Sequence, residues 1–283
     1  MKRALVTLVL GEPYRARFAE HAAPTFRAYA KAHGLSLVVL DRLLDDSERG
    51  RGRSPAWQKC RLFDHPRLRA CDQVLWLDAD IVIAPDAPSV FEAVPPGVLG
   101  AVEQYSSPSP GEYAAAQART RRYLAAKGLA APEDATPQDF YRHYGFKDGP
   151  DAVVQTGMLV LTPEVHGPVM LAAYAEERRP DSRDMLFEMR PLSYHLLRSG
   201  PVRWLDPRFN ALWATTLVNR YPFLMDPGFL TPYRERPDLL ARLKAACLQT
   251  ALDEAYFLHF AGVGQDMAYL LPPKSVNDPN GPR

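Results

Sequence analysis

The segment Asp78-Ala79-Asp80 places two carboxylates one residue apart, directly after the apolar run Gln73-Val74-Leu75-Trp76-Leu77. A buried strand would direct both side chains beyond its end, and the small Ala79 allows close approach. Hard divalent cations take oxygen ligands, and a cation held in this way can neutralise a diphosphate group. The same pattern also occurs in ordinary turns, which is the alternative interpretation.

A histidine far along the chain is the third candidate ligand. His259 lies in the apolar segment Tyr256-Phe257-Leu258-His259-Phe260, and Gly262 and Gly264 follow it. Neutral imidazole is a common metal ligand, although a lone histidine in an apolar segment can also be a core residue. The two glycines are typical of a loop that approaches a phosphate. They favour a metal site formed by Asp78, Asp80 and His259.

The elements that must position these side chains alternate along the first 80 residues. The apolar, β-branched run 4–10 predicts a buried strand, and residues 14–33 predict a helix that ends at Gly34. The prediction continues with a strand at 35–40, a loop at 42–54, a helix at 56–69 and a strand at 73–77. This order predicts βαβ units and a parallel sheet. Asp78 would then lie at the carboxyl edge, where open α/β sheets bind ligands.

The rest of the chain continues the pattern after one interruption. Residues 106–150 are rich in Pro, Gly and Ala and include an amphipathic stretch at 111–127, which predicts a helical insertion covering the site. The other predicted elements are a short helix at 88–93, a strand at 98–103, a strand at 153–161, helices at 163–178 and 185–199, and strands at 202–205 and 256–260. We expect one domain over residues 1–271 and a loose tail over 272–283.

Composition excludes several classes of protein. The chain has 34 basic and 33 acidic side chains in 283 residues, so its charge gives no reason to expect a nucleic acid as partner. Its three cysteines have neither disulfide-framework nor zinc-site spacing. No stretch approaches the roughly 20 apolar residues that span a bilayer, and the short run at 4–10 lacks a signal-peptide cleavage site. We expect a soluble, cytoplasmic protein.

The chain resembles the GT-A fold glycosyltransferases, especially retaining families 8 and 34, from about residue 4 to residue 262. Five segments in order carry the resemblance: Leu5-Val6-Thr7 through Tyr14, Trp57-Gln58-Lys59, Asp78-Ala79-Asp80, Gln155-Thr156-Gly157-Met158, and Phe257-Leu258-His259-Phe260-Ala261-Gly262. The resemblance implies a Rossmann-like, mostly parallel sheet flanked by helices. It also implies transfer of a sugar, with retention, from a UDP- or GDP-linked donor to an unknown acceptor hydroxyl, using Mn²⁺ or Mg²⁺.

The resemblance also implies roles for individual residues. The donor-binding set is Thr7, Leu8, Gly11, Tyr14, Trp57, Lys59, Asp78, Ala79, Gly157, Gly262 and Gln265. Three places have a structural alternative: Thr7 could be a β-branched strand residue, Lys59 an exposed helical lysine, and Gln155-Thr156-Gly157 a bulge. The chain departs from family 8 at Val263-Gly264-Gln265-Asp266, where that family has a phosphate-binding lysine. Lys59 or Lys274 could substitute.

Glu188 is the leading candidate for a catalytic residue, with Gln155 and Asp184 as further candidates. It would lie at or just before the start of a helix and face the anomeric carbon, as a nucleophile or as a stabiliser of positive charge. A structural first-turn acid is the alternative. Aromatic residues in the insertion either line an acceptor pocket or pack the insertion: Tyr105, Tyr113, Tyr123, Phe140, Tyr141 and Tyr144.

Three other functions share features with this sequence. A haloacid-dehalogenase-type phosphatase needs Gly-Thr after the second aspartate, whereas Ile81-Val82-Ile83 follows here. A sugar-nucleotide pyrophosphorylase needs a Gly-rich loop after the first strand, and Gly11-Glu12-Pro13-Tyr14 offers a single glycine. A non-catalytic nucleotide-sugar-binding module remains compatible with the sequence, because function lies in the site and not in the fold.

Overall fold

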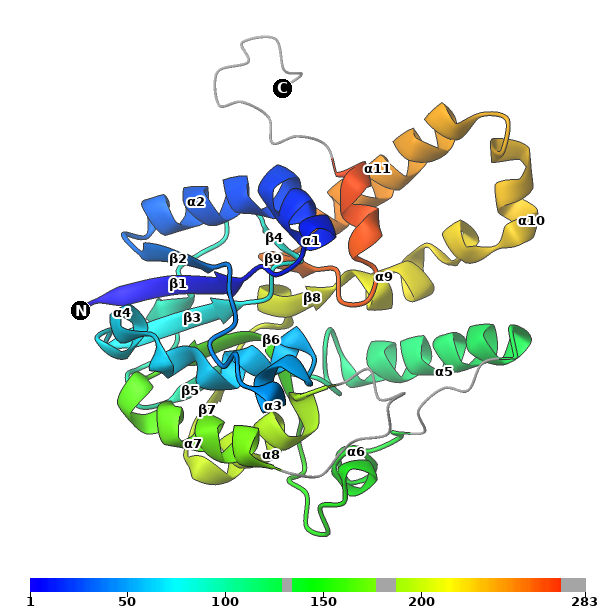
Figure 1. The fold of residues 1–283 in the computed structure, drawn as a ribbon. Helices are drawn as coiled ribbons and strands as arrows, with labels where there is room; N and C mark the ends of the chain where they lie inside the picture. Colours follow the sequence, from blue (N-terminus) through cyan, green and yellow to red (C-terminus); the bar gives the residue numbers. More distant parts are fainter. Residues whose placement is uncertain (129–133, 177–186, 271–283) are drawn as a thin grey trace.

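A six-stranded sheet forms the centre of the protein in a computed structural model that describes residues 1–128, 134–176 and 187–270 (Figure 1). Its strands run in the spatial order β2-β1-β3-β6-β5-β7. In chain order they are β1 Arg3–Leu8, β2 Ser36–Leu40, β3 Gln73–Leu77, β5 Leu99–Glu103, β6 Val154–Leu161 and β7 Val202–Trp204. Five strands share one direction and β6 runs against it. The prediction of an α/β fold with a mostly parallel sheet is confirmed.

Helices cover both faces of this sheet, which is why β1 is a continuous apolar run. Leu5 enters a core cluster with Phe18 and Phe26, whereas Ala4 and Val6 enter a second cluster on the opposite face. Figure 1 shows α1 and α2 over one face and α7 and α8 over the other. The helices are α1 Glu12–Arg17, α2 Ala23–Ala32, α3 Glu48–Arg51, α4 Pro66–Arg69, α5 Pro110–Ala126, α6 Pro137–Tyr144, α7 Pro163–Ala175, α8 Met189–Ser199, α9 Trp213–Arg220, α10 Pro227–Leu230 and α11 Pro237–Asp253.

Proline explains why two predicted helices are broken. The helix predicted at 14–33 consists of α1, a π-helical turn at Phe18–Ala22, and α2. Pro24 has no N–H to donate and its ring crowds the carbonyl four residues earlier, so the backbone widens into a π turn before it. The helix predicted at 56–69 is a 3₁₀-helix at Pro55–Asp64 followed by α4. Pro66 keeps the preceding residue, His65, extended (ψ 118°).

Other predicted boundaries shift by a few residues. The strand predicted at 4–10 ends at Leu8, and the loop predicted at 42–54 contains α3. The helix predicted at 14–33 ends at Gly34 as expected, because Gly34 has a φ of 64°. There the Leu35 N–H donates to the Ala30 carbonyl over 2.8 Å.

A second, three-stranded sheet was not predicted and matters most for the site. It has the order β4-β9-β8, with β4 at Ile81–Ile83, β9 at Phe257–His259 and β8 at Ala211–Leu212. Its central strand pairs His259 with Ile81 on one side and with Leu212 on the other. The sheet therefore brings the candidate histidine beside the Asp78–Asp80 segment.

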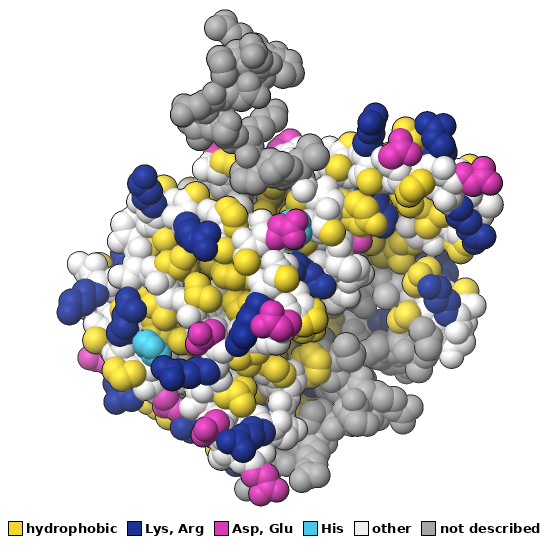
Figure 2. All heavy atoms as spheres, turned by 45° about the horizontal axis from the view of Figure 1, so that its top comes forward, with side chains coloured by type: hydrophobic (Ala, Val, Ile, Leu, Met, Phe, Trp, Pro, Cys, Tyr) yellow, Lys and Arg dark blue, Asp and Glu magenta, His cyan; other side chains and the backbone are white. Residues whose placement is uncertain are grey.

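The remaining helices lie at the periphery. The segment between β5 and β6 carries α5 and α6, and α9 to α11 form an arm that extends from the small sheet in Figure 1. Among the described residues, no helix has both the length and the apolar character needed to cross a membrane. Acidic and basic side chains are interspersed on the face shown in Figure 2.

Candidate functional site

Asp78, Asp80 and His259 converge on one point at the junction of the two sheets. Asp78 follows β3, and its N–H donates to the Gly157 carbonyl on β6 over 2.8 Å. The Asp80 carbonyl accepts the N–H of Phe260, the residue after His259, over 2.9 Å. One possible ligand atom from each of the three predicted metal ligands lies within 4.8 Å of the others.

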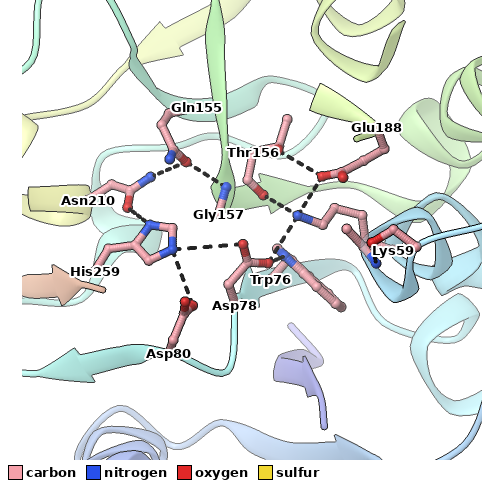
Figure 3. A network of polar contacts seen from close by, with 12 residues as sticks. Lys59, Trp76, Asp78, Asp80, Gln155, Thr156, Gly157, Glu188, Asn210 and His259 are labelled. Atoms are coloured by element: carbon pink, nitrogen blue, oxygen red, sulfur yellow. Dashed lines mark hydrogen bonds and ion pairs between the residues drawn. The ribbon is translucent and has the colours of Figure 1, made fainter. Parts of the chain in front are cut away.

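The geometry of these groups suits a divalent cation. His259 Nε2 lies 3.3 Å from Asp80 Oδ1 and 3.9 Å from Asp78 Oδ2 (Figure 3). The aspartate side chains are 29% and 31% exposed, whereas the imidazole is 3% exposed. Two accessible carboxylates and one buried imidazole form a mixed oxygen and nitrogen ligand set that a divalent cation could use.

The charges of the cluster depend on the protonation of His259. Burial alone would lower the pKa of His259, but the Asp80 and Asp78 carboxylates outweigh it and raise the pKa above its usual value. Desolvation would raise the pKa of Asp80, but the pKa lies below its usual value because His259 and Lys59 favour the ionised form. Without a cation, the proton on the imidazole balances part of the negative charge.

Lys59 is buried and belongs to the same site. Its ammonium lies 3.0 Å from Asp78 Oδ1, 2.8 Å from Glu188 Oε1 and 3.1 Å from the Thr156 carbonyl, so all three N–H donors have an acceptor. Burial would lower the pKa of Lys59, but the two carboxylates outweigh it and raise the pKa. The alternative of an exposed helical lysine is therefore wrong.

The two oxygens of Asp78 have different surroundings. Oδ1 accepts from Lys59 and from the Trp76 indole N–H at 2.9 Å, whereas Oδ2 faces His259. Glu188 immediately precedes α8 and is 3% exposed, and its Oε1 also accepts from the Thr156 hydroxyl at 3.0 Å. With a neutral imidazole, three carboxylates and one ammonium leave two negative charges, which a divalent cation would neutralise.

Gln155 is connected to His259 by hydrogen bonds through Asn210, a residue that was not predicted from the sequence. Gln155 Oε1 accepts from the Gly157 N–H at 2.7 Å and from the Asn210 amide at 2.7 Å. Asn210 Oδ1 in turn lies 2.9 Å from His259 Nδ1, and all three side chains are buried. Nothing in the sequence marks Asn210, because only the pairing of β8 with β9 places it beside His259.

Gly157 has a clear structural requirement. A Cβ atom at this position would lie 2.3 Å from His259 Cε1. The absence of a side chain at Gly157 therefore leaves the space that the His259 imidazole occupies.

The residues predicted to hold the nucleoside have varied environments. Thr7 is fully buried, and its hydroxyl has no hydrogen-bond partner among the described residues. Gly11 has a φ of 82°, which favours glycine, and Tyr14 is 60% exposed. Leu8 and Ala79 are half-buried. Trp57 instead lies in the core, where its ring faces Tyr174 with centroids 6.3 Å apart.

The loop after β9 is shaped by two glycines. Gly262 has a φ of 72°, and Gln265 is exposed. A Cβ atom at Gly264 would lie 2.7 Å from Arg17 Nη1, so the guanidinium of Arg17 rests against this loop. Lys274 and Asp184, which the sequence analysis also named, lie outside the described residues.

Most of the aromatic residues in the insertion are core residues. Tyr113, Phe140, Tyr141 and Tyr144 are at most 8% exposed, and Tyr105 packs against Tyr113 with ring centroids 4.9 Å apart. These contacts favour the packing alternative over an acceptor pocket for these side chains.

No protein-family model and no curated protein matches the sequence. Among solved structures, the chain is similar to a glycosyltransferase involved in glycosylation of the major capsid of PBCV-1, with 11% identity and a TM-score of 0.49 over 94% of this chain and 100% of that one. It is similar to the galactosyltransferase LgtC in complex with donor and acceptor sugar analogues, with 14% identity and a TM-score of 0.49 over 94% of each chain. It is also similar to mouse xyloside xylosyltransferase 1, with 12% identity and a TM-score of 0.40 over 81% of this chain and 93% of that one. These three solved structures are all described as glycosyltransferases. With TM-scores of 0.49 or less, the case for function rests on the site.

Proposed function

We propose that this protein is a metal-dependent glycosyltransferase that uses a nucleotide-diphospho-sugar. The observation that carries the proposal is the convergence of Asp78, Asp80 and His259 beside the buried Lys59–Glu188 pair. With a neutral imidazole, the cluster has two uncompensated negative charges, and two of its carboxylates are accessible to a divalent cation. A bound Mn²⁺ or Mg²⁺ would supply charge neutralisation for the leaving diphosphate.

The residues around the cation would position the donor. Lys59 holds Oδ1 of Asp78 and leaves Oδ2 for the cation. Glu188 is held by Lys59 and Thr156, and we propose that its charge stabilises the positive charge that develops on the sugar. We also propose retention at the anomeric carbon, as the resemblance to families 8 and 34 implies.

We assign the contact with the outer phosphate to Arg17. Within residues 1–128, 134–176 and 187–270, Arg17 forms no ion pair. Its guanidinium lies over the Tyr14 ring, 5.7 Å from the centroid, and against Gly264 in the loop after β9. Lys59 has no free donor for this contact, because all three of its N–H groups already have acceptors. A guanidinium is well suited to bind phosphate oxygens in pairs.

The test is a screen of UDP- and GDP-linked sugars with Mn²⁺ or Mg²⁺, in which release of the nucleoside diphosphate is measured. We expect turnover with at least one donor, and a loss of about 100-fold or more in Asp80→Asn because a direct metal ligand is weakened. Asp86→Asn is the matched control, because Asp86 is exposed. Arg17→Gln should raise KM for the donor, whereas Arg15→Gln should not, since Arg15 is already bound to Glu12 and the Asp41 carbonyl.

Two other outcomes would identify a different function, and a third would contradict the metal site. Metal-dependent binding of a nucleotide-sugar without turnover would indicate a binding module. Release of phosphate from a generic phosphoester would indicate a phosphatase. Equal activity of Asp80→Asn and Asp86→Asn would contradict the proposed metal site.

A further inference from the structure

A chain of hydrogen bonds fixes which nitrogen of the neutral His259 ring carries the proton. It starts at the Gly157 N–H, which can only donate, so the Gln155 atom 2.7 Å away must be the carbonyl oxygen. That oxygen also contacts Asn210, which must therefore present its NH₂ group at 2.7 Å. Asn210 consequently turns Oδ1 toward His259 Nδ1 at 2.9 Å. An amide oxygen can only accept, so Nδ1 carries the proton.

The tautomer determines what Nε2, the ring nitrogen on the opposite side of His259, offers to the two aspartates. If Nδ1 is protonated in the neutral ring, Nε2 bears the lone pair, and it faces Asp80 and Asp78 (Figure 3). The opposite tautomer would place a hydrogen on Nε2, where Asp80 Oδ1 at 3.3 Å would accept it. That hydrogen would occupy the place of a metal ion. The amide chain and the Asp80 carboxylate thus favour opposite tautomers.

We propose that Gln155 and Asn210 are positioning residues that hold His259 in the tautomer that binds metal. The starting point of the chain is a backbone N–H on β6, which cannot rotate, and every side chain in it is buried. Gln155 therefore acts through His259 and not on the sugar. The inference rests on the proposed metal site, and it adds two residues that act without contacting the cation. Groups that orient a metal-bound histidine in this way commonly contribute 10- to 100-fold to metal affinity.

The test compares substitutions of similar size. Gln155→Glu keeps an oxygen that accepts from both Gly157 and Asn210, whereas Gln155→Met removes it; Asn210→Leu removes the acceptor at Nδ1. Mn²⁺ affinity is measured from the electron paramagnetic resonance signal of the free ion. We expect Gln155→Glu to stay within about threefold of the parent, and the other two variants to lose about 10- to 100-fold.

A spectroscopic measurement shows whether the variants change the tautomer of His259 or only the packing around it. In ¹H–¹⁵N spectra of the metal-free protein at alkaline pH, with the His259 signals assigned through His259→Gln, the parent and Gln155→Glu should show protonated Nδ1. Asn210→Leu should show protonated Nε2. If Asn210→Leu does not fold, the two Gln155 variants still decide the question, with thermal unfolding as the folding control.

The outcomes distinguish this inference from the proposed function. Equal Mn²⁺ affinity in Gln155→Met and Gln155→Glu, or an unchanged tautomer in Asn210→Leu, would overturn the inference even if the enzyme is active. Retained tautomer control and Mn²⁺ binding without turnover of any nucleotide-sugar would support the inference and count against the proposed function.

Discussion

At the scale of single residues, Lys59 joins Asp78 to Glu188 with only 3% of its side chain exposed. Lys59→Met would leave the carboxylates of Asp78 and Glu188 without the ammonium group between them. We expect it to lower the free energy of unfolding by about 3–5 kcal/mol. Adding Glu188→Gln should recover part of this loss, because one of the unpaired charges is removed. Urea denaturation at pH 7 measures both effects.

The control for Lys59 is the exposed Lys147, whose replacement by Met should change stability by no more than about 0.5 kcal/mol. A loss of that small size in Lys59→Met would contradict the ion-pair network. The network would also be contradicted if the stability changes of Lys59→Met and Glu188→Gln were fully additive in the double variant.

His259 gives the site its dependence on pH. The carboxylates of Asp80 and Asp78 raise its pKa in the folded, metal-free protein. Their attraction therefore stabilises that state below the unfolded pKa of about 6.5 and is lost as the pH rises through the folded pKa. A metal ion needs the neutral ring, so Mn²⁺ affinity should fall as the pH drops through the raised pKa.

Calorimetry in buffers of different ionisation enthalpy measures this proton directly. We expect Mn²⁺ binding near neutral pH to release protons in the parent protein, and fewer in His259→Gln. Binding that is independent of pH between about 6 and 8 would show that His259 is not a ligand.

Single residues also show where sequence reasoning ends. Asp78, Asp80 and His259 could be proposed because their types and positions suit a metal ion, and the structure brings them together. Asn210 could not, because an isolated asparagine carries no signal until β8 pairs with β9. The burial of Lys59 was equally hidden, since a lysine in a helical segment is normally exposed.

At the scale of elements, the close approach of the His259 ring, on β9, to the backbone of β6 depends on Gly157. A Cβ atom there would lie 2.3 Å from His259 Cε1, so Gly157→Ala must displace the imidazole. We expect a loss of about 1–3 kcal/mol in stability, and Mn²⁺ affinity weakened at least tenfold. Thermal unfolding and Mn²⁺ titration measure the two effects.

Gly111 in α5 provides the matched control, because a Cβ atom there meets nothing within 4 Å. Gly111→Ala should be neutral or stabilise the protein by up to about 1 kcal/mol. If Gly157→Ala behaves in the same way, the imidazole is not confined as described.

Element prediction succeeded where an element has many residues and one pattern. β1, β3 and β6 are mostly apolar and almost entirely buried, and such segments can be recognised in a sequence. β4 and β8 have three and two residues, too few to show any period, and they form only because β9 lies between them. The parts of the fold that were missed are therefore the parts that complete the site.

At the scale of the whole molecule, the candidate metal ligands belong to both sheets. Asp78 directly follows β3 in the large sheet, whereas His259 is the last residue of β9 in the small one. A cation bound by both would link the sheets, so we expect Mn²⁺ to slow amide hydrogen exchange in β8 and β9. β2, at the outer edge of the large sheet, should exchange at an unchanged rate.

Mass spectrometry of peptides that cover residues 36–40, 211–212 and 257–259 measures this difference. The slowing at β8 and β9 should disappear in Asp80→Asn, because the ion is then held weakly. Equal slowing in all three peptides would mean that Mn²⁺ suppresses only global unfolding. In that case the cation would not act as a link between the sheets, although it would still bind the folded chain.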